Sequence, residues 1–69
     1  MKDTNDYIKE RYKLYLKQCQ IFSGNPTEIV RAKCAFEIRL ACLSEMELID
    51  EIRLQRLLIV AENVCNKYI

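Results

Sequence analysis

The sequence predicts an all-α fold, a small three-helix bundle with helices at about 5–22, 26–43 and 45–67. Apolar types make up 51% of the 69 residues, which is enough for a folded core. They recur at steps of three and four, the spacing of a helix face. The single Gly and the single Pro both lie in FSGNPTE, so few positions interrupt a helix. At this length we expect one domain spanning 1–69.

The first helix carries an apolar stripe that repeats at steps of four and three. A second set of apolar residues, which recur at steps of seven, indicates that this helix contacts two neighbouring helices. The stripe consists of Ile8, Tyr12, Tyr15, Cys19 and Phe22.

The segment FSGNPTE predicts the corner between the first two helices. Gly24 suits the left-handed residue that ends a helix. Asn25 can cap the next helix, and Pro26 fits its first turn. Glu28, three residues after Asn25, completes a capping box.

A second corner is predicted at Ser44. The apolar stripe of the second helix, continued in heptad steps, meets Glu47 and Asp50, so its register fails just after Ser44. Ser44 and Glu47 form a capping box, and Glu45 adds negative charge where a helix N-terminus favours it. Because no glycine marks this corner, a helical hairpin with one long kinked second helix over 26–67 remains the alternative.

The second helix has small residues around much of its circumference. They would let neighbouring backbones approach from more than one side, which predicts a central position for this helix. These residues are Ala32, Cys34, Ala35, Ala41 and Cys42.

Catalytic and metal-binding patterns are missing from the sequence. Without His there is no Ser–His or Cys–His pair, and one Gly cannot form a phosphate-binding loop. The acidic residues Glu45, Glu47, Asp50 and Glu51 are typical of the start of a helix, where they face its dipole. We therefore expect no enzyme: no catalytic residue, no metal, no cofactor and no small-molecule substrate.

The four cysteines, Cys19, Cys34, Cys42 and Cys65, show no CxxC spacing. This predicts free thiols that act as small buried apolar residues in a reducing compartment. The polar N-terminus does not resemble a signal peptide, and no apolar run approaches membrane-spanning length. We expect a cytoplasmic protein that does not contact a membrane.

The third predicted helix contains the apolar run Leu57–Ala61, which points around more of the helix than two neighbours can cover. We therefore expect a protein–protein interaction module, a regulator, inhibitor or chaperone that binds a partner protein or itself as a homodimer. The predicted interaction residues are Arg53, Arg56, Leu57, Leu58, Ile59 and Val60.

The alternative function is a nucleic-acid-binding regulator. Lys9, Lys13 and Lys17 form a ridge of cations one turn apart that could contact phosphates. However, the net charge is only +1, and no predicted helix presents several side chains that read base edges.

Overall fold

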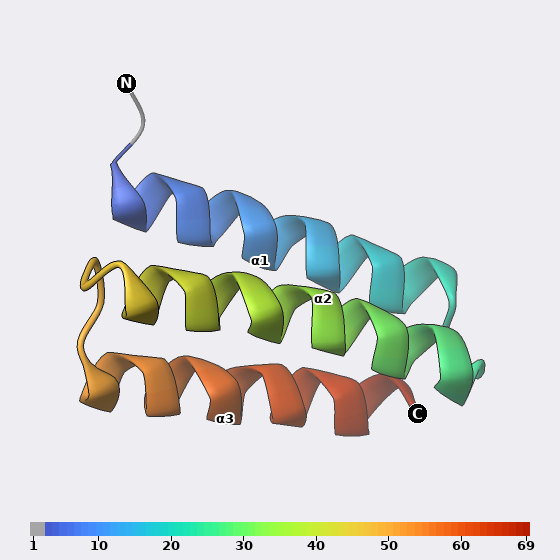
Figure 1. The fold of residues 1–69 in the computed structure, drawn as a ribbon. Helices are drawn as coiled ribbons and strands as arrows, with labels where there is room; N and C mark the ends of the chain where they lie inside the picture. The colour runs from blue at the N-terminus through green and yellow to red at the C-terminus, as the bar shows by residue number, and fades with distance from the viewer. Residues whose placement is uncertain (1–2) are drawn as a thin grey trace.

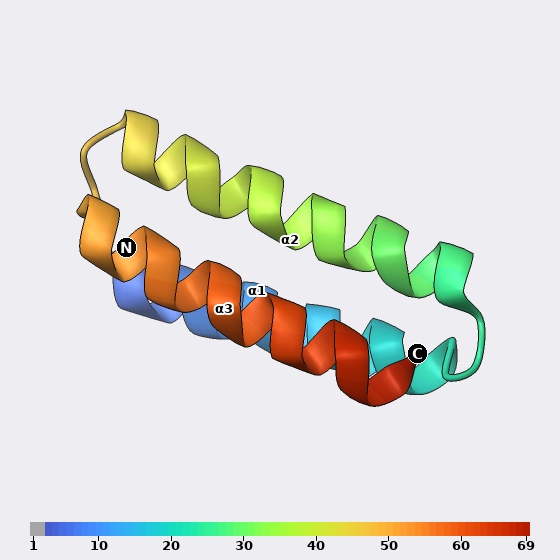
Figure 2. The ribbon, with the colours of Figure 1, turned by 90° about the horizontal axis from the view of Figure 1, so that it is seen from below.

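The computed structural model describes residues 3–69, which form three helices: α1 (Thr4–Ile21), α2 (Pro26–Glu45) and α3 (Glu51–Tyr68). In Figure 1, α1 and α3 run from left to right and α2 runs back from right to left, so α2 is antiparallel to both neighbours. The predicted three-helix bundle is confirmed, and the alternative of one long kinked second helix is wrong. Seen from below, α2 lies on one side of the molecule, and α3 lies in front of α1 on the other (Figure 2).

The first corner forms largely as predicted. Gly24 has a φ of 85°, a conformation that glycine adopts without steric cost. The Asn25 side chain accepts a hydrogen bond from the Glu28 N–H at 3.4 Å, and Pro26 begins α2. The capping box is incomplete, because the Asn25 N–H donates to the Phe22 carbonyl and the Glu28 carboxylate accepts from Arg31.

The second corner differs from the prediction, because Ser44 lies inside α2 rather than before α3. The Glu47 N–H donates to the Ser44 carbonyl at 3.0 Å, and the Leu48 N–H donates to the Leu43 carbonyl at 2.9 Å. These two bonds are a Schellman motif, in which the residue after the C-cap is left-handed. Glu47 has a φ of 60° and occupies the position where glycine is usual.

The third helix begins at Glu51, six residues after the predicted start at 45. Its N-cap is Asp50, whose carboxylate accepts from the Arg53 N–H at 2.7 Å. The predicted capping box of Ser44 and Glu47 is therefore wrong. The apolar register failed at the right place because the chain leaves the helix there, but five residues of loop, 46–50, separate the two helices.

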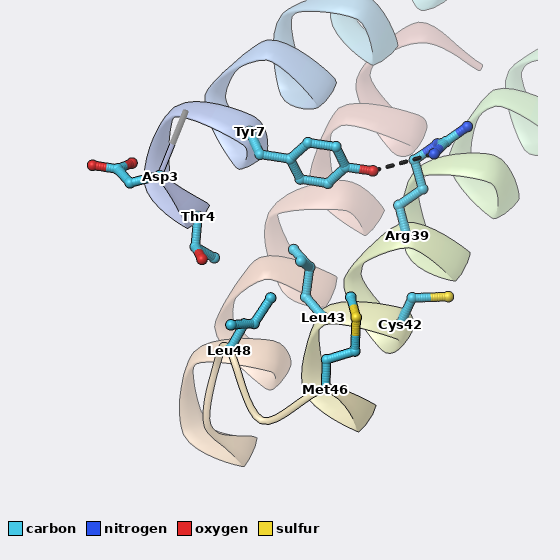
Figure 3. A pocket seen from close by; sticks show the side chains of 8 residues that line it. All are labelled: Asp3, Thr4, Tyr7, Arg39, Cys42, Leu43, Met46 and Leu48. Carbon is cyan, nitrogen blue, oxygen red and sulfur yellow. Dashed lines mark hydrogen bonds between the residues drawn. The ribbon is translucent and has the colours of Figure 1, made fainter. Parts of the chain in front are cut away.

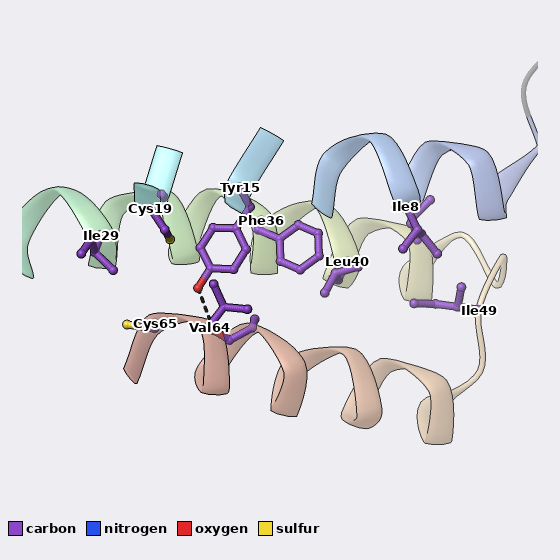
Figure 4. Packing of buried hydrophobic residues seen from close by; sticks show 12 residues of the cluster. Ile8, Tyr15, Cys19, Ile29, Phe36, Leu40, Ile49, Val64 and Cys65 are labelled. Atoms are coloured by element: carbon purple, nitrogen blue, oxygen red, sulfur yellow. Dashed lines mark hydrogen bonds between the residues drawn. The ribbon is translucent and has the colours of Figure 1, made fainter. Parts of the chain in front are cut away.

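The core lies along the centre of the bundle, with Tyr15 at the junction of all three helices (Figure 4). Tyr15 belongs to α1, stacks on Phe36 of α2 with ring centroids 5.1 Å apart, and donates its hydroxyl to the Ala61 carbonyl of α3 at 2.7 Å. The predicted stripe of α1 is confirmed at Ile8, Tyr15 and Cys19, which are all buried. Phe22 is the C-cap of α1 and is 38% exposed.

Most of the small residues of α2, and two of the four cysteines, are less buried than the sequence predicts. α2 packs more extensively on α1 and on α3 than these two pack on each other, which agrees with a central position. Yet only Ala32 among the small residues is buried, and Cys34, Ala35, Ala41 and Cys42 are exposed. All four cysteines are unpaired, but only Cys19 and Cys65 are buried, so the prediction of four buried thiols is half wrong.

The second corner can be tested with two alanine substitutions. Asp50→Ala should lower the free energy of unfolding by about 1 kcal/mol, because it removes the cap of α3. Ser44→Ala should be neutral or slightly stabilising, because alanine is the best helix former inside α2. Urea unfolding measures both. A loss for Ser44→Ala as large as that for Asp50→Ala would contradict the observed corner.

Alkaline pH should destabilise the fold through Tyr15 and Cys19. Burial raises the pKa of the Tyr15 hydroxyl and of the Cys19 thiol, since it disfavours the charged forms. A group whose pKa is higher in the folded state contributes fully to the free energy of unfolding below its unfolded-state pKa. This contribution is lost as the pH rises toward the pKa of the folded state. The free energy of unfolding should therefore fall above about pH 8.5 through the thiol, and further above about pH 10 through the tyrosine.

Urea unfolding between pH 7 and pH 11 tests this dependence, with Tyr15→Phe as the control. The variant should be less stable at pH 7 by about 1 kcal/mol, because it lacks the hydrogen bond to Ala61. It should nevertheless lose less stability than the wild type above about pH 10. Equal losses in the two proteins would show that the Tyr15 hydroxyl does not titrate with unfolding.

Candidate interaction surface

The apolar run Leu57–Ala61 of α3 is partly buried in the bundle and partly exposed. Ala61 is fully buried, and Leu57 and Leu58 are half-buried and pack against the core. Ile59 and Val60 are exposed, at 60% and 39%. Of the predicted interaction residues, these two are the apolar side chains that remain largely accessible.

The two predicted arginines on α3 lie in different surroundings. Arg53 is half-buried and donates a hydrogen bond to the Asn5 side chain of α1. Arg56 is exposed, and by helical spacing it lies on the outward face with Ile52 and Ile59. Arg56 is thus the better placed of the two to pair with a carboxylate of another molecule.

A more continuous apolar surface runs along the exposed side of α2, opposite the buried stripe of this helix. We call it the α2 outer face. Ile38 is at its centre and is 63% exposed, and Val30 and Met46 at its ends are 42% and 60% exposed. The α2 outer face consists of nine residues, all of them exposed: Val30, Arg31, Cys34, Ala35, Ile38, Ala41, Cys42, Glu45 and Met46.

The α2 outer face adjoins a pocket between the start of α1 and the corner after α2 (Figure 3). The pocket has a volume of about 410 Å³, and Cys42 and Met46 of the α2 outer face help to line it. At its rim the Arg39 guanidinium donates to the Tyr7 hydroxyl oxygen at 3.1 Å, and this bond lowers the pKa of Tyr7. The remaining lining residues are Asp3, Thr4, Leu43 and Leu48.

A smaller groove lies between α2 and α1. It has a volume of about 230 Å³, and Ala35 of the α2 outer face and Leu14 of α1 both line it. Leu14 is 44% exposed. Leu14 therefore adds an exposed apolar side chain beside the α2 outer face, and Arg11, Gln18 and Arg39 also line the groove.

The predicted lysine ridge is present on the solvent side of α1. Lys9, Lys13 and Lys17 are all exposed. By helical spacing, Asp6 and Glu10 lie on the same side of α1, so anionic side chains alternate with the cations. The ridge is a mixed surface rather than a purely positive one.

The Cys19 thiol lies in the core of the bundle. Burial raises the pKa of the Cys19 thiol, which disfavours the thiolate that acts as a nucleophile. No group of acidic or cysteine side chains in residues 3–69 is arranged to hold a metal ion. Within the same residues, no helix combines the length and apolarity needed to cross a membrane.

Sequence reasoning missed the α2 outer face because it assigned the small residues of α2 to contacts inside the chain. The signal was nevertheless present. Ile29, Phe36, Leu40 and Leu43 already complete the buried stripe, so apolar residues on the opposite side of the helix exceed what the core uses. The interface was sought on α3 instead.

Together the fold and these surfaces define a small helical bundle with an uncovered apolar helix face. Comparison with protein-family models gave no match. Searches of curated proteins and of solved structures likewise gave no match.

The mixed charge of the lysine ridge leads to a prediction about nucleic acids. Because Asp6 and Glu10 offset part of the ridge, we expect no retention of DNA or RNA in filter binding at low salt and micromolar protein. Retention that is lost in a Lys9→Glu, Lys13→Glu, Lys17→Glu variant would contradict this and support the alternative function.

Proposed function

We propose that this protein is a protein–protein interaction module, a regulator, inhibitor or chaperone whose activity is binding, and that its main contact is the α2 outer face. The observation that carries the proposal is the exposure of this face. From Val30 to Met46, seven of its nine members are apolar, and its only charged members, Arg31 and Glu45, lie near its two ends.

Burial of apolar side chains would drive binding at this face. Covering a side chain such as Ile38 contributes roughly 1.5–3 kcal/mol. The small residues beside it, Cys34, Ala35, Ala41 and Cys42, let the axis of an incoming helix approach closely, to about 8 Å. A surface of this kind suits another helix better than a flat or irregular partner.

The predicted surface on α3 takes second place in this proposal. Ile59 is exposed, but by helical spacing its neighbours include Gln55, Arg56 and Asn63, which are also exposed. It could extend a contact without forming its apolar centre. The exposed thiols of Cys34 and Cys42 favour a reducing compartment such as the cytoplasm, where they would remain unpaired.

The cysteines supply the test of this proposal. The purified protein at nanomolar concentration and the protein in a lysate of its native cells would be labelled with iodoacetamide, and each site would be quantified by peptide mass spectrometry. Cys34 and Cys42 should react about tenfold more slowly in the lysate, the protection expected when a partner is present at about ten times its Kd. Cys19 and Cys65 are buried and report unfolding.

Two matched variants separate covering of the α2 outer face from other causes of slow labelling. Ile38→Glu should restore fast labelling in the lysate, because a buried unpaired charge opposes binding. Ile59→Glu places the same charge at an equally exposed position on α3 and should leave the protection in place. Equal labelling rates of the wild type in both conditions would overturn the proposal, since the face would then be uncovered.

A further inference from the structure

The residues of the α2 outer face repeat in reverse order about Ile38. Alanines lie three residues before and after it, Ala35 and Ala41, and cysteines lie four residues before and after it, Cys34 and Cys42. The same relation holds further out, where residues of opposite charge or of similar apolarity correspond. These outer pairs are Arg31 with Glu45 and Val30 with Met46.

From this symmetry we infer that the α2 outer face binds the same face of a second copy of the chain, with the two α2 helices antiparallel and a two-fold axis at Ile38. This inference rests on the proposed function and names the partner. In an antiparallel pair, a residue that precedes Ile38 lies level with the residue equally far after Ile38 in the other copy. Each half of the face therefore meets the half that matches it.

The charges select this arrangement. Seven residues correspond to about 10 Å along a helix, so Arg31 lies level with Glu45 of the second copy, and the pair occurs twice. A parallel arrangement would instead oppose Arg31 to Arg31 and Glu45 to Glu45, which is unfavourable. In the single chain Arg31 contacts Glu28 at 3.3 Å while 74% exposed, and an exposed pair of this kind contributes little.

The uncharged residues favour the same contact. Two Ile38 side chains meet at the two-fold axis, where both become buried, and the alanines and cysteines beside them keep the helix axes close. Leu14 of α1, which lines the groove beside Ala35, lies at the edge of this surface and can add to the buried apolar area. The contact therefore has an apolar centre with charged ends, as stable interfaces do.

The geometry makes the two exposed cysteines a sensitive probe. With axes about 8 Å apart and Cα atoms about 2.3 Å from each axis, Cys34 and Cys42 of the second copy have Cα atoms about 5–6 Å apart. A disulfide requires about 4.4–6.8 Å. Two Cys34 residues lie about 12 Å apart along the axis, and so do two Cys42 residues, so neither can link to itself.

The test is oxidation with diamide, which takes two protons and two electrons from each pair of thiols that it joins. The wild type at tens of micromolar should form a covalent dimer. Cys34→Ser and Cys42→Ser should each remain monomeric on a denaturing gel. A mixture of the two variants should form the dimer again, because one Cys34 then meets one Cys42. Linked dimers of either variant alone, or none from the mixture, would overturn the antiparallel arrangement.

A charge exchange provides a second measurement that does not depend on thiols. Arg31→Glu and Glu45→Arg should each weaken the dimer about tenfold in sedimentation equilibrium, because each opposes like charges twice. The double variant should recover wild-type association, although it also lacks the Arg31–Glu28 contact. Failure of the double variant to recover would contradict the pairing.

These experiments distinguish failure of the self-pairing from failure of the proposed function. A wild type that stays monomeric at tens of micromolar and forms no cross-link would overturn the self-pairing. If Cys34 and Cys42 were still protected in the lysate, the α2 outer face would be covered by a different protein, and the proposed function would stand. Without that protection, both would fail.

Discussion

The contacts of Tyr15 are the constraint on which the bundle depends. A buried hydroxyl needs a hydrogen-bond partner, and the Ala61 carbonyl at 2.7 Å supplies it. At the same time the ring stacks on Phe36, so one side chain fixes the distance and rotation of α1 relative to both other helices. In a chain of this length, which buries only about 60% of its unfolded surface, few other contacts can do the same.

The two corners show how much of the fold the sequence could predict. The first was predictable because its signals are side chains: Gly24 has a positive φ, Asn25 caps and Pro26 starts the helix. The second was misplaced because its main signal is backbone hydrogen bonding, with Glu47 where glycine is usual. Asp50 was visible as an acidic residue, but Ser44 and Glu47 resembled a cap more closely.

The candidate surface was only partly predictable, because apolar periodicity does not say which apolar face of a helix is buried. On α3 the sequence identified Ile59 and Val60, and both are exposed. On α2 the small residues were consistent either with close packing inside the chain or with a free surface. The choice depends on where the neighbouring helices lie. Only the bundle shows that Cys34 and Cys42 are exposed.

The shape of the molecule connects its stability to its surface. The Cα positions extend over 35 × 24 × 14 Å, so the bundle is thin and the core has little depth. A partner that covers the α2 outer face would extend this core on the side opposite the buried stripe of α2. Because such a partner binds only the folded chain, its binding free energy adds to the free energy of unfolding by mass action. The same apolar residues that leave the isolated bundle incompletely covered would thus stabilise both the fold and the complex.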